Sequence, residues 1–215
     1  MDKDNSRFNS FSVPLGLLDY VNPILYSITI ITVIRNTYSS MDMPFNVMLL
    51  IGAIISVFFG FIIPTGKVIV GLGIIQFRMP VSLVFCVNTG ILISGLMLLK
   101  YVMDMSTAAI CILIAVIIAL LVLIYAKSRK INSIAVLTGA AGYLMLYTSL
   151  ITLSVRSGLR IPVIMYAVAI LLFIMLCGIG IKADLKNPRV HWVIEISNVI
   201  CQGLVAIATV LLFRR

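Results

Sequence analysis

The sequence predicts an all-α, polytopic integral membrane protein with seven transmembrane helices, and its composition is the main reason. Of the 215 residues, 62% are hydrophobic and 11% are charged, whereas soluble domains have about 45–50% apolar and about 25% charged residues. The charged residues cluster between long apolar runs. So few charges cannot cover a soluble globule, and their placement excludes a disordered chain, a disulfide-built secreted domain and a conventional nucleic-acid-binding domain.

The second reason is the length of the apolar runs. A spanning helix needs about 20 mainly apolar residues, because the hydrocarbon core is about 30 Å thick and a helix rises about 1.5 Å per residue. The segments that meet this requirement are 17–34, 46–63, 79–99, 105–126, 132–154, 161–181 and 190–213. They form one transmembrane domain, 17–215, after a polar N-terminus at 1–16 in which no cleaved signal peptide is visible.

The first segment carries a polar stripe. Asp19, Asn22, Tyr26 and Thr29 are spaced by three, four and three residues, which places them on one helical face. Pro23 removes a backbone donor near the start of this helix and predicts a kink there. We interpret Asp19 as a first-turn carboxylate that stabilises the positive end of the helix dipole. The alternative is that it belongs to a binding site.

The connection after the second segment, residues 64–78, has two interpretations. It contains a ten-residue apolar piece between a proline and an arginine, which is too short to span a membrane. One interpretation is an interfacial loop or an overlong, tilted second helix. The other is a re-entrant half-helix, whose free backbone groups must be satisfied by protein or by a water-filled cavity.

Small residues recur at four-residue spacing in the second and third segments. Such residues let two helix backbones approach closely, so we interpret them as packing seams. They are Gly52, Ser56, Gly60, Gly90 and Ser94. The four cysteines lie singly inside apolar runs and are interpreted as packing residues as well.

An internal repeat is one interpretation of the third and sixth segments. Arg78 and Lys100 bracket the third, and Arg160 and Lys182 bracket the sixth, each pair 22 residues apart with a proline near the start. Two contiguous three-helix units would be inverted relative to each other, as in many secondary transporters. The predicted arrangement is 1+3+3, with repeats at 46–126 and 132–213. The alternative is convergent helix-end chemistry, because the rest of the overlay is poor.

The seventh segment has the clearest polar stripe. His191, Glu195, Asn198, Gln202 and Thr209 are spaced by four, three, four and seven residues, so they share a helical face that cannot contact lipid. The expected partner of Glu195 is His191 or a basic side chain of a neighbouring helix. The stripe lines a route for a solute or proton, or it holds the bundle together by hydrogen bonds between helices.

Basic residues predict the topology. The N-terminus and the connections after the second, fourth and sixth segments hold ten of the 16 lysines and arginines, which predicts a cytoplasmic N-terminus and a multi-pass protein of the cell membrane. The basic residues expected to contact anionic headgroups or an anionic substrate are Lys67, Arg78, Arg160, Lys182 and the cluster at 127–130.

Together these features favour a transporter or channel for a small solute or ion, with a polar cavity lined by the first, third and seventh helices. The candidate binding residues are Glu195, His191, Asn198, Gln202, Asn88, Tyr26 and Asp19. A membrane-embedded subunit, sensor or lipid-interacting protein, with a second copy or another membrane protein as partner, is the alternative.

The third reading is an intramembrane enzyme that uses His191 and Glu195. A single histidine in the chain excludes a multi-histidine zinc site, and no catalytic motif is present, so an enzyme is not favoured. No cofactor and no metal site is expected.

Overall fold

The computed structural model describes residues 12–74, 80–128, 131–182 and 188–214, and these residues form helices joined by short connections. The helices are α1 (Val13–Asp19), α2 (Val21–Thr37), the short 3-10 helix η2 (Tyr38–Ser40), α3 (Phe45–Gly71), α4 (Val81–Met103), α5 (Thr107–Ser128), α6 (Ile131–Arg156), α7 (Arg160–Lys182) and α8 (Pro188–Phe213). Seven spans in the described residues are long and apolar enough to cross a membrane. The predicted all-α, polytopic class is confirmed.

The first span, Val13–Ser40, is two helices separated by a break at Tyr20. Pro23 has no backbone N–H to donate to the carbonyl of Asp19, and its ring crowds that carbonyl. Helix α1 ends at Asp19 and α2 begins at Val21, so the helix is interrupted near this proline, and the predicted kink itself stays a prediction.

The interpretation of Asp19 as a first-turn carboxylate is wrong. Helix α1 begins at Val13, with a proline in its first turn, and it has no acidic residue in that turn. Asp19 is its last residue, and is 8% exposed. The predicted boundary at position 17 was wrong because Pro14 and Gly16 are typical of turns, whereas residues 13–16 form the first turn of α1.

Helix α3 is 27 residues long and runs through Pro64 to Gly71 without a break. Residues 64–71 are thus the last two turns of the second span, as in the overlong-helix interpretation. The re-entrant interpretation is wrong for these residues, and residues 75–79 lie outside the part that the structure describes.

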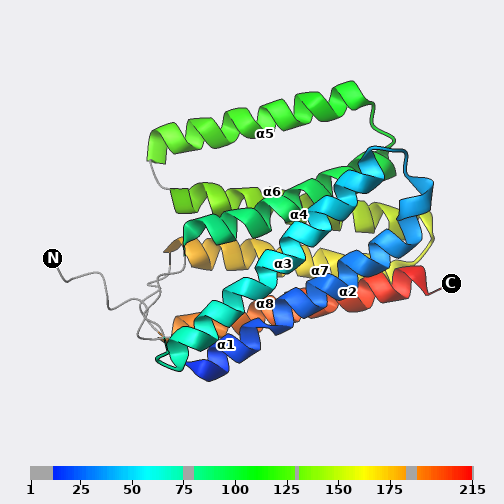
Figure 1. Cartoon of the computed structure of the whole chain (residues 1–215). Helices are drawn as coiled ribbons and strands as arrows, with labels where there is room; N and C mark the ends of the chain where they lie inside the picture. The colour runs from blue at the N-terminus through cyan, green and yellow to red at the C-terminus, as the bar shows by residue number, and fades with distance from the viewer. Residues whose placement is uncertain (1–11, 75–79, 129–130, 183–187, 215) are drawn as a thin grey trace.

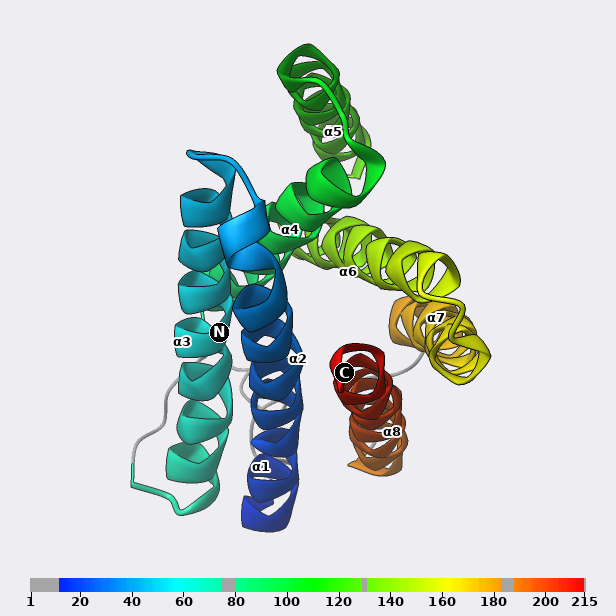
Figure 2. The ribbon, with the colours of Figure 1, turned by 90° about the vertical axis from the view of Figure 1, so that its right-hand side faces the viewer.

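Six of the helical segments form a closed ring in the order α2, α3, α4, α6, α7 and α8, with α8 returning to α2. Figure 2 shows α6, α7 and α8 strongly foreshortened and α2 and α3 lengthwise, with α5 outside the ring. Helix α5 contacts α6. Figure 1 shows that α1 begins and α8 ends at opposite ends of the bundle, as an odd number of crossings requires. The proposed inverted repeat stays a prediction.

Glycines allow the closest contacts in the ring. A Cβ on Gly90 would lie 2.6 Å from the backbone nitrogen of Ser56, and one on Gly142 would lie 2.6 Å from that of Leu92. The first contact joins α3 to α4 and the second joins α4 to α6. The small-residue seam predicted between the second and third spans is therefore confirmed for Gly52, Ser56, Gly90 and Ser94.

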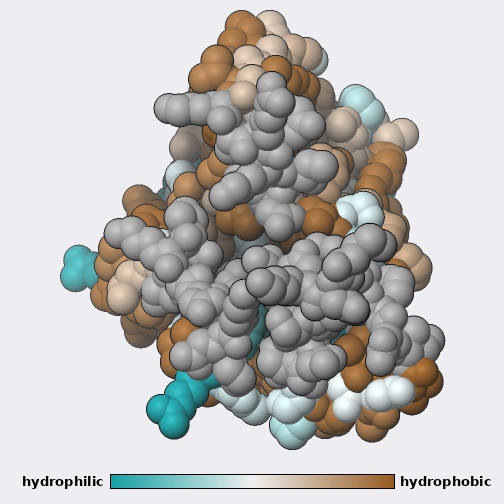
Figure 3. All heavy atoms as spheres, turned by 90° about the vertical axis from the view of Figure 1, so that its left-hand side faces the viewer, coloured by the Kyte–Doolittle hydropathy of each residue, from teal (hydrophilic) through white to brown (hydrophobic). Residues whose placement is uncertain are grey.

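The outer faces of the helices are apolar, as expected for helices surrounded by lipid. Helix α5 is the extreme case, because only 6% of its most apolar window is buried. Figure 3 shows the end of the bundle at which α1 begins, and brown hydrophobic side chains extend around much of its edge while teal groups are few. Polar groups inside the ring therefore need a separate explanation.

Candidate functional site

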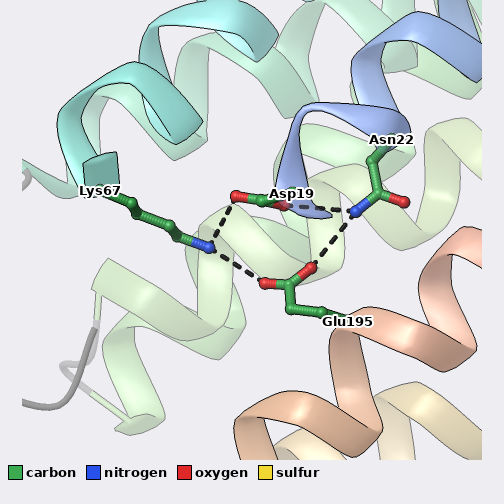
Figure 4. Close-up of polar contacts among 4 residues, drawn as sticks. All are labelled: Asp19, Asn22, Lys67 and Glu195. Carbon is green, nitrogen blue, oxygen red and sulfur yellow. Dashed lines mark hydrogen bonds and ion pairs between the residues drawn. The ribbon is translucent and has the colours of Figure 1, made fainter. Parts of the chain in front are cut away.

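A cluster of charged and polar side chains lies inside the bundle at the end where α1 begins. The Lys67 ammonium is 2.7 Å from Oδ2 of Asp19 and 3.0 Å from Oε1 of Glu195. The Asn22 amide nitrogen donates to Oδ1 of Asp19 and to Oε2 of Glu195, both at 3.2 Å. Figure 4 shows that the four side chains converge from α1, α2, α3 and α8. We call Asp19, Asn22, Lys67 and Glu195 the charged cluster.

Local helix geometry brings these four residues together. The break at Tyr20 places Asp19 and Asn22 on either side of a helix junction. The continuation of α3 beyond Pro64 carries Lys67 to the same level. Glu195 lies about two turns inside α8, which begins at Pro188. The four side chains therefore lie at one level of the bundle, near the ends of the helices that carry them.

The cluster contains two carboxylates and one ammonium among the described residues, so its formal charge is negative. The side chains of Lys67, Asp19 and Glu195 are only 15%, 12% and 11% exposed. A charged group inside a membrane protein is costly unless it is paired or faces water. Both carboxylates of the cluster are paired with the Lys67 ammonium, and this pairing offsets part of the cost.

A cavity of about 170 Å³ adjoins the cluster near the axis of the ring. The lining comes from α1, α2, α3, α4, α6 and α8, and its polar members are Asp19, Asn22, Tyr26, Ser56, Asn88, Tyr143 and Asn198. Liquid water occupies about 30 Å³ per molecule, so this space suits about five waters or one small solute. It has the dimensions of a binding site for a molecule of a few non-hydrogen atoms.

Several polar groups of the lining are already held in place. The Ser56 hydroxyl donates to the Tyr26 hydroxyl at 3.2 Å, and the Asn88 amide donates to the carbonyl of Ala135 at 2.7 Å. The Tyr26 and Tyr143 rings meet edge to face, with centroids 6.3 Å apart. The side-chain oxygen Oδ1 of Asn22, in contrast, is a buried acceptor with no hydrogen-bond partner in the described structure.

The bundle is dry and closely packed further along α8. Gln202 donates to the Tyr147 hydroxyl at 3.3 Å, and the Thr209 and Tyr166 hydroxyls are 2.9 Å apart. Gln202 is 2% exposed, and Thr209, Tyr147 and Tyr166 are fully buried. These two buried pairs link α8 to α6 and α7 beyond the cavity, and we call them the dry layer.

The predicted stripe on the last span therefore divides into two parts. Asn198 lines the cavity and Glu195 joins the charged cluster, while Gln202 bonds to a neighbouring helix. His191 is half-buried, one turn before Glu195, and is not part of the lining. Of the two partners expected for Glu195, the basic side chain of a neighbouring helix is confirmed, and it is Lys67.

The other predicted residues are distributed as follows. Asp19, Tyr26 and Asn88 line the cavity. Lys67 was expected to meet anionic headgroups, but its ammonium points inward to two carboxylates. Arg160 is exposed at the start of α7, where its headgroup contact stays a prediction. Arg78 and the side chain of Lys182 lie outside the described part.

The sequence contained a signal for Lys67 that the prediction did not use. Ser56, Gly60, Ile63 and Lys67 are spaced by four, three and four residues, the same spacing as the first four members of the stripe on the last span. Once α3 is continued to Gly71, this spacing places Lys67 on the face that lines the cavity. Tyr143 carried no comparable signal, because tyrosines at membrane depth are compatible with ordinary packing.

The position of the polar side chains also bears on the partner-binding and enzyme interpretations of the sequence. A partner-binding stripe would lie on the surface of the bundle, whereas Glu195 and Gln202 are 9% and 2% exposed in the single chain. No group of three His, Cys, Asp or Glu side chains suited to a metal ion is found within the described ranges. Comparison of the chain with protein-family models, with curated proteins and with solved structures finds no match.

Proposed function

We propose that this membrane protein is a carrier for a small polar solute, which binds in the cavity beside the charged cluster. The observation that carries the proposal is a polar, solute-sized cavity at the centre of a ring of spans. Polar groups at membrane depth are costly and mark solute or ion routes.

The dry layer beyond the cavity favours a carrier over an open channel. A channel needs a continuous polar path, whereas the Gln202–Tyr147 and Thr209–Tyr166 pairs fill the interior on one side. A carrier exposes its site to one side of the membrane at a time, with the other side closed by packed side chains. The present arrangement corresponds to closure on the side away from the charged cluster.

The charged cluster is suited to closing the opposite side. Lys67 joins α3 to α1 and to α8 through two ion pairs, and Asn22 adds a bond from α2. Separation of these partners lets α8 move relative to α1 and α3, with the break at Tyr20 as a joint. Since the predicted topology places the N-terminus in the cytoplasm, we assign this closure to the cytoplasmic side.

The experiment is solute uptake by the purified protein in proteoliposomes. The probes are radiolabelled methylammonium, glycine, glycerol and acetate, which are small enough for the cavity and differ in charge. We expect saturable uptake of at least one probe above protein-free vesicles. Val87→Phe should abolish that uptake, because Val87 lines the cavity and a phenyl group would fill it.

Val122→Phe is the matched control, because Val122 is 61% exposed on the lipid-facing surface of α5. It should transport at the rate of the parent protein. Absence of saturable uptake for all four probes would contradict the proposal. Equal uptake by the Val87→Phe variant and the parent would remove the cavity from the route.

A further inference from the structure

The lining of the cavity carries a charge of one sign. Asp19 is the only ionised side chain among the described residues that line it, and no basic side chain is present in that lining. Lys67 is bound to Oδ2 of Asp19 from outside the lining. A solute in the cavity therefore meets the Asp19 carboxylate. The ammonium that pairs with this carboxylate, that of Lys67, is also paired with Glu195.

The neutral groups of the lining favour the same type of ligand. The Asn22 carbonyl oxygen is a buried acceptor without a partner, and a ligand N–H group would satisfy it. A carboxylate and an amide oxygen together recognise an ammonium group through charge-assisted hydrogen bonds.

We propose that the cavity binds a small organic monocation with N–H donors, a primary amine in its protonated form, through Asp19 and Asn22. This inference rests on the proposed function and specifies its substrate class. The ammonium would approach the Asp19 carboxylate and the Asn22 oxygen, and the alkyl part would lie toward Ile91 and Val87. Among the described residues of the charged cluster, binding would match two carboxylates with two cations.

The size of the cavity distinguishes this ligand from an inorganic cation. A single dehydrated metal ion needs several oxygen ligands at about 2.3–2.6 Å, whereas about 170 Å³ is a space for several non-hydrogen atoms. Lys67 provides an internal example of the proposed chemistry, since its own alkylammonium group lies between the two carboxylates. The charged cluster beside the cavity thus already holds an ammonium group at hydrogen-bond distance from Asp19.

The test is binding to the purified full-length protein in detergent, followed by thermal unfolding. The probes are propylammonium chloride, propanol and sodium propionate, which have similar size and different charge, with sodium chloride as the ionic-strength control. A ligand that binds only the folded state raises the Tm in a saturable way. We expect a saturable rise for propylammonium, with an apparent affinity at least about tenfold above that for propanol or propionate, equivalent to about 1.4 kcal/mol.

Asp19→Asn should weaken propylammonium binding by about tenfold or more, because the charge that attracts the ligand is removed. Asp42→Asn is the matched control, since Asp42 is an exposed carboxylate in the connection between η2 and α3. If Asp19→Asn fails to fold, the comparison of the three solutes on the parent protein still decides the matter.

An equal Tm rise with propanol, with propionate or with sodium chloride would overturn the inference. Its failure is distinguishable from failure of the proposed function. Uptake of glycerol or acetate without selective propylammonium binding would retain the carrier and reject the cationic substrate. Selective binding without uptake of any probe would retain the site and reject the carrier.

Discussion

Replacement of Lys67 by methionine should destabilise the protein, because it leaves two carboxylates facing each other. Oδ2 of Asp19 and Oε1 of Glu195 are 2.7 and 3.0 Å from the same nitrogen. Their separation is thus at most about 6 Å, and at an effective dielectric constant of about 20 two unit charges at ~6 Å repel by ~3 kcal/mol. This agrees with the cost of about 3–5 kcal/mol for breaking a buried ion pair by removing one partner.

The assay is the free energy of unfolding in mixed micelles, titrated with a denaturing detergent, for the parent and for Lys67→Met. We expect a loss of about 3 kcal/mol at neutral pH. The loss should shrink in acid, because protonation of either carboxylate removes the repulsion. Arg35→Met is the control, since Arg35 is an exposed cation in the last turn of α2. A change within about 0.5 kcal/mol for Lys67→Met would refute the reasoning.

A second variant separates charge repulsion from simple loss of packing. Glu195→Gln on its own leaves the Lys67–Asp19 pair intact at 2.7 Å and should retain most of the stability. Combined with Lys67→Met, it removes the repulsion and should restore about 2–3 kcal/mol. If the double variant is as unstable as the sum of the two single variants, the groups are not coupled.

The remaining predictions concern packing and the buried hydrogen bonds, and each is checked by the same unfolding assay. Gly142→Ala should cost about 1–3 kcal/mol because its Cβ would meet the α4 backbone at 2.6 Å, whereas Gly203→Ala, with no atom nearer than 3.9 Å, should be neutral or stabilising. Gln202→Leu should cost about 0.6–2 kcal/mol by removing the bond to Tyr147, and a neutral result would mean that this pair does not hold the dry layer. Asn88→Leu should cost a similar ~1 kcal/mol, because Asn88 ties α4 to the Ala135 carbonyl of α6.

The spans could be predicted because the thickness of the bilayer sets a length that apolar runs must match. The inward direction of the two polar stripes followed from helical periodicity and the cost of polar groups in lipid. Glu195 could therefore be identified as an interior residue from the sequence. Asp19 was placed at the start of a helix instead, because the sequence does not show that α1 begins at Val13. The pairing of these residues with one another could not be predicted, because periodicity indicates one face of a helix and does not show which helix packs against it.

Lys67 illustrates the limit of charge-based topology. Lysines near span ends usually extend to the interface. The rule that basic loops are cytoplasmic counts lysines and arginines, and it cannot detect two carboxylates on other helices. The position of Lys67 depends on where α3 ends. This helix continues through Pro64, although proline usually breaks a helix. Tertiary contacts around Pro64, which is buried, override the local preference.

The proposed function requires a water-accessible cavity that lies beside the charged cluster and ends before the dry layer. Chemical modification of introduced cysteines measures this access directly. In a variant without the four native cysteines, Asn198→Cys and Gln202→Cys would each be exposed to the small cationic reagent 2-aminoethyl methanethiosulfonate. We expect the reagent to modify Asn198→Cys, propylammonium to protect that cysteine, and Gln202→Cys to stay unmodified. An unreactive Asn198→Cys, or equal reactivity at both positions, would contradict this expectation.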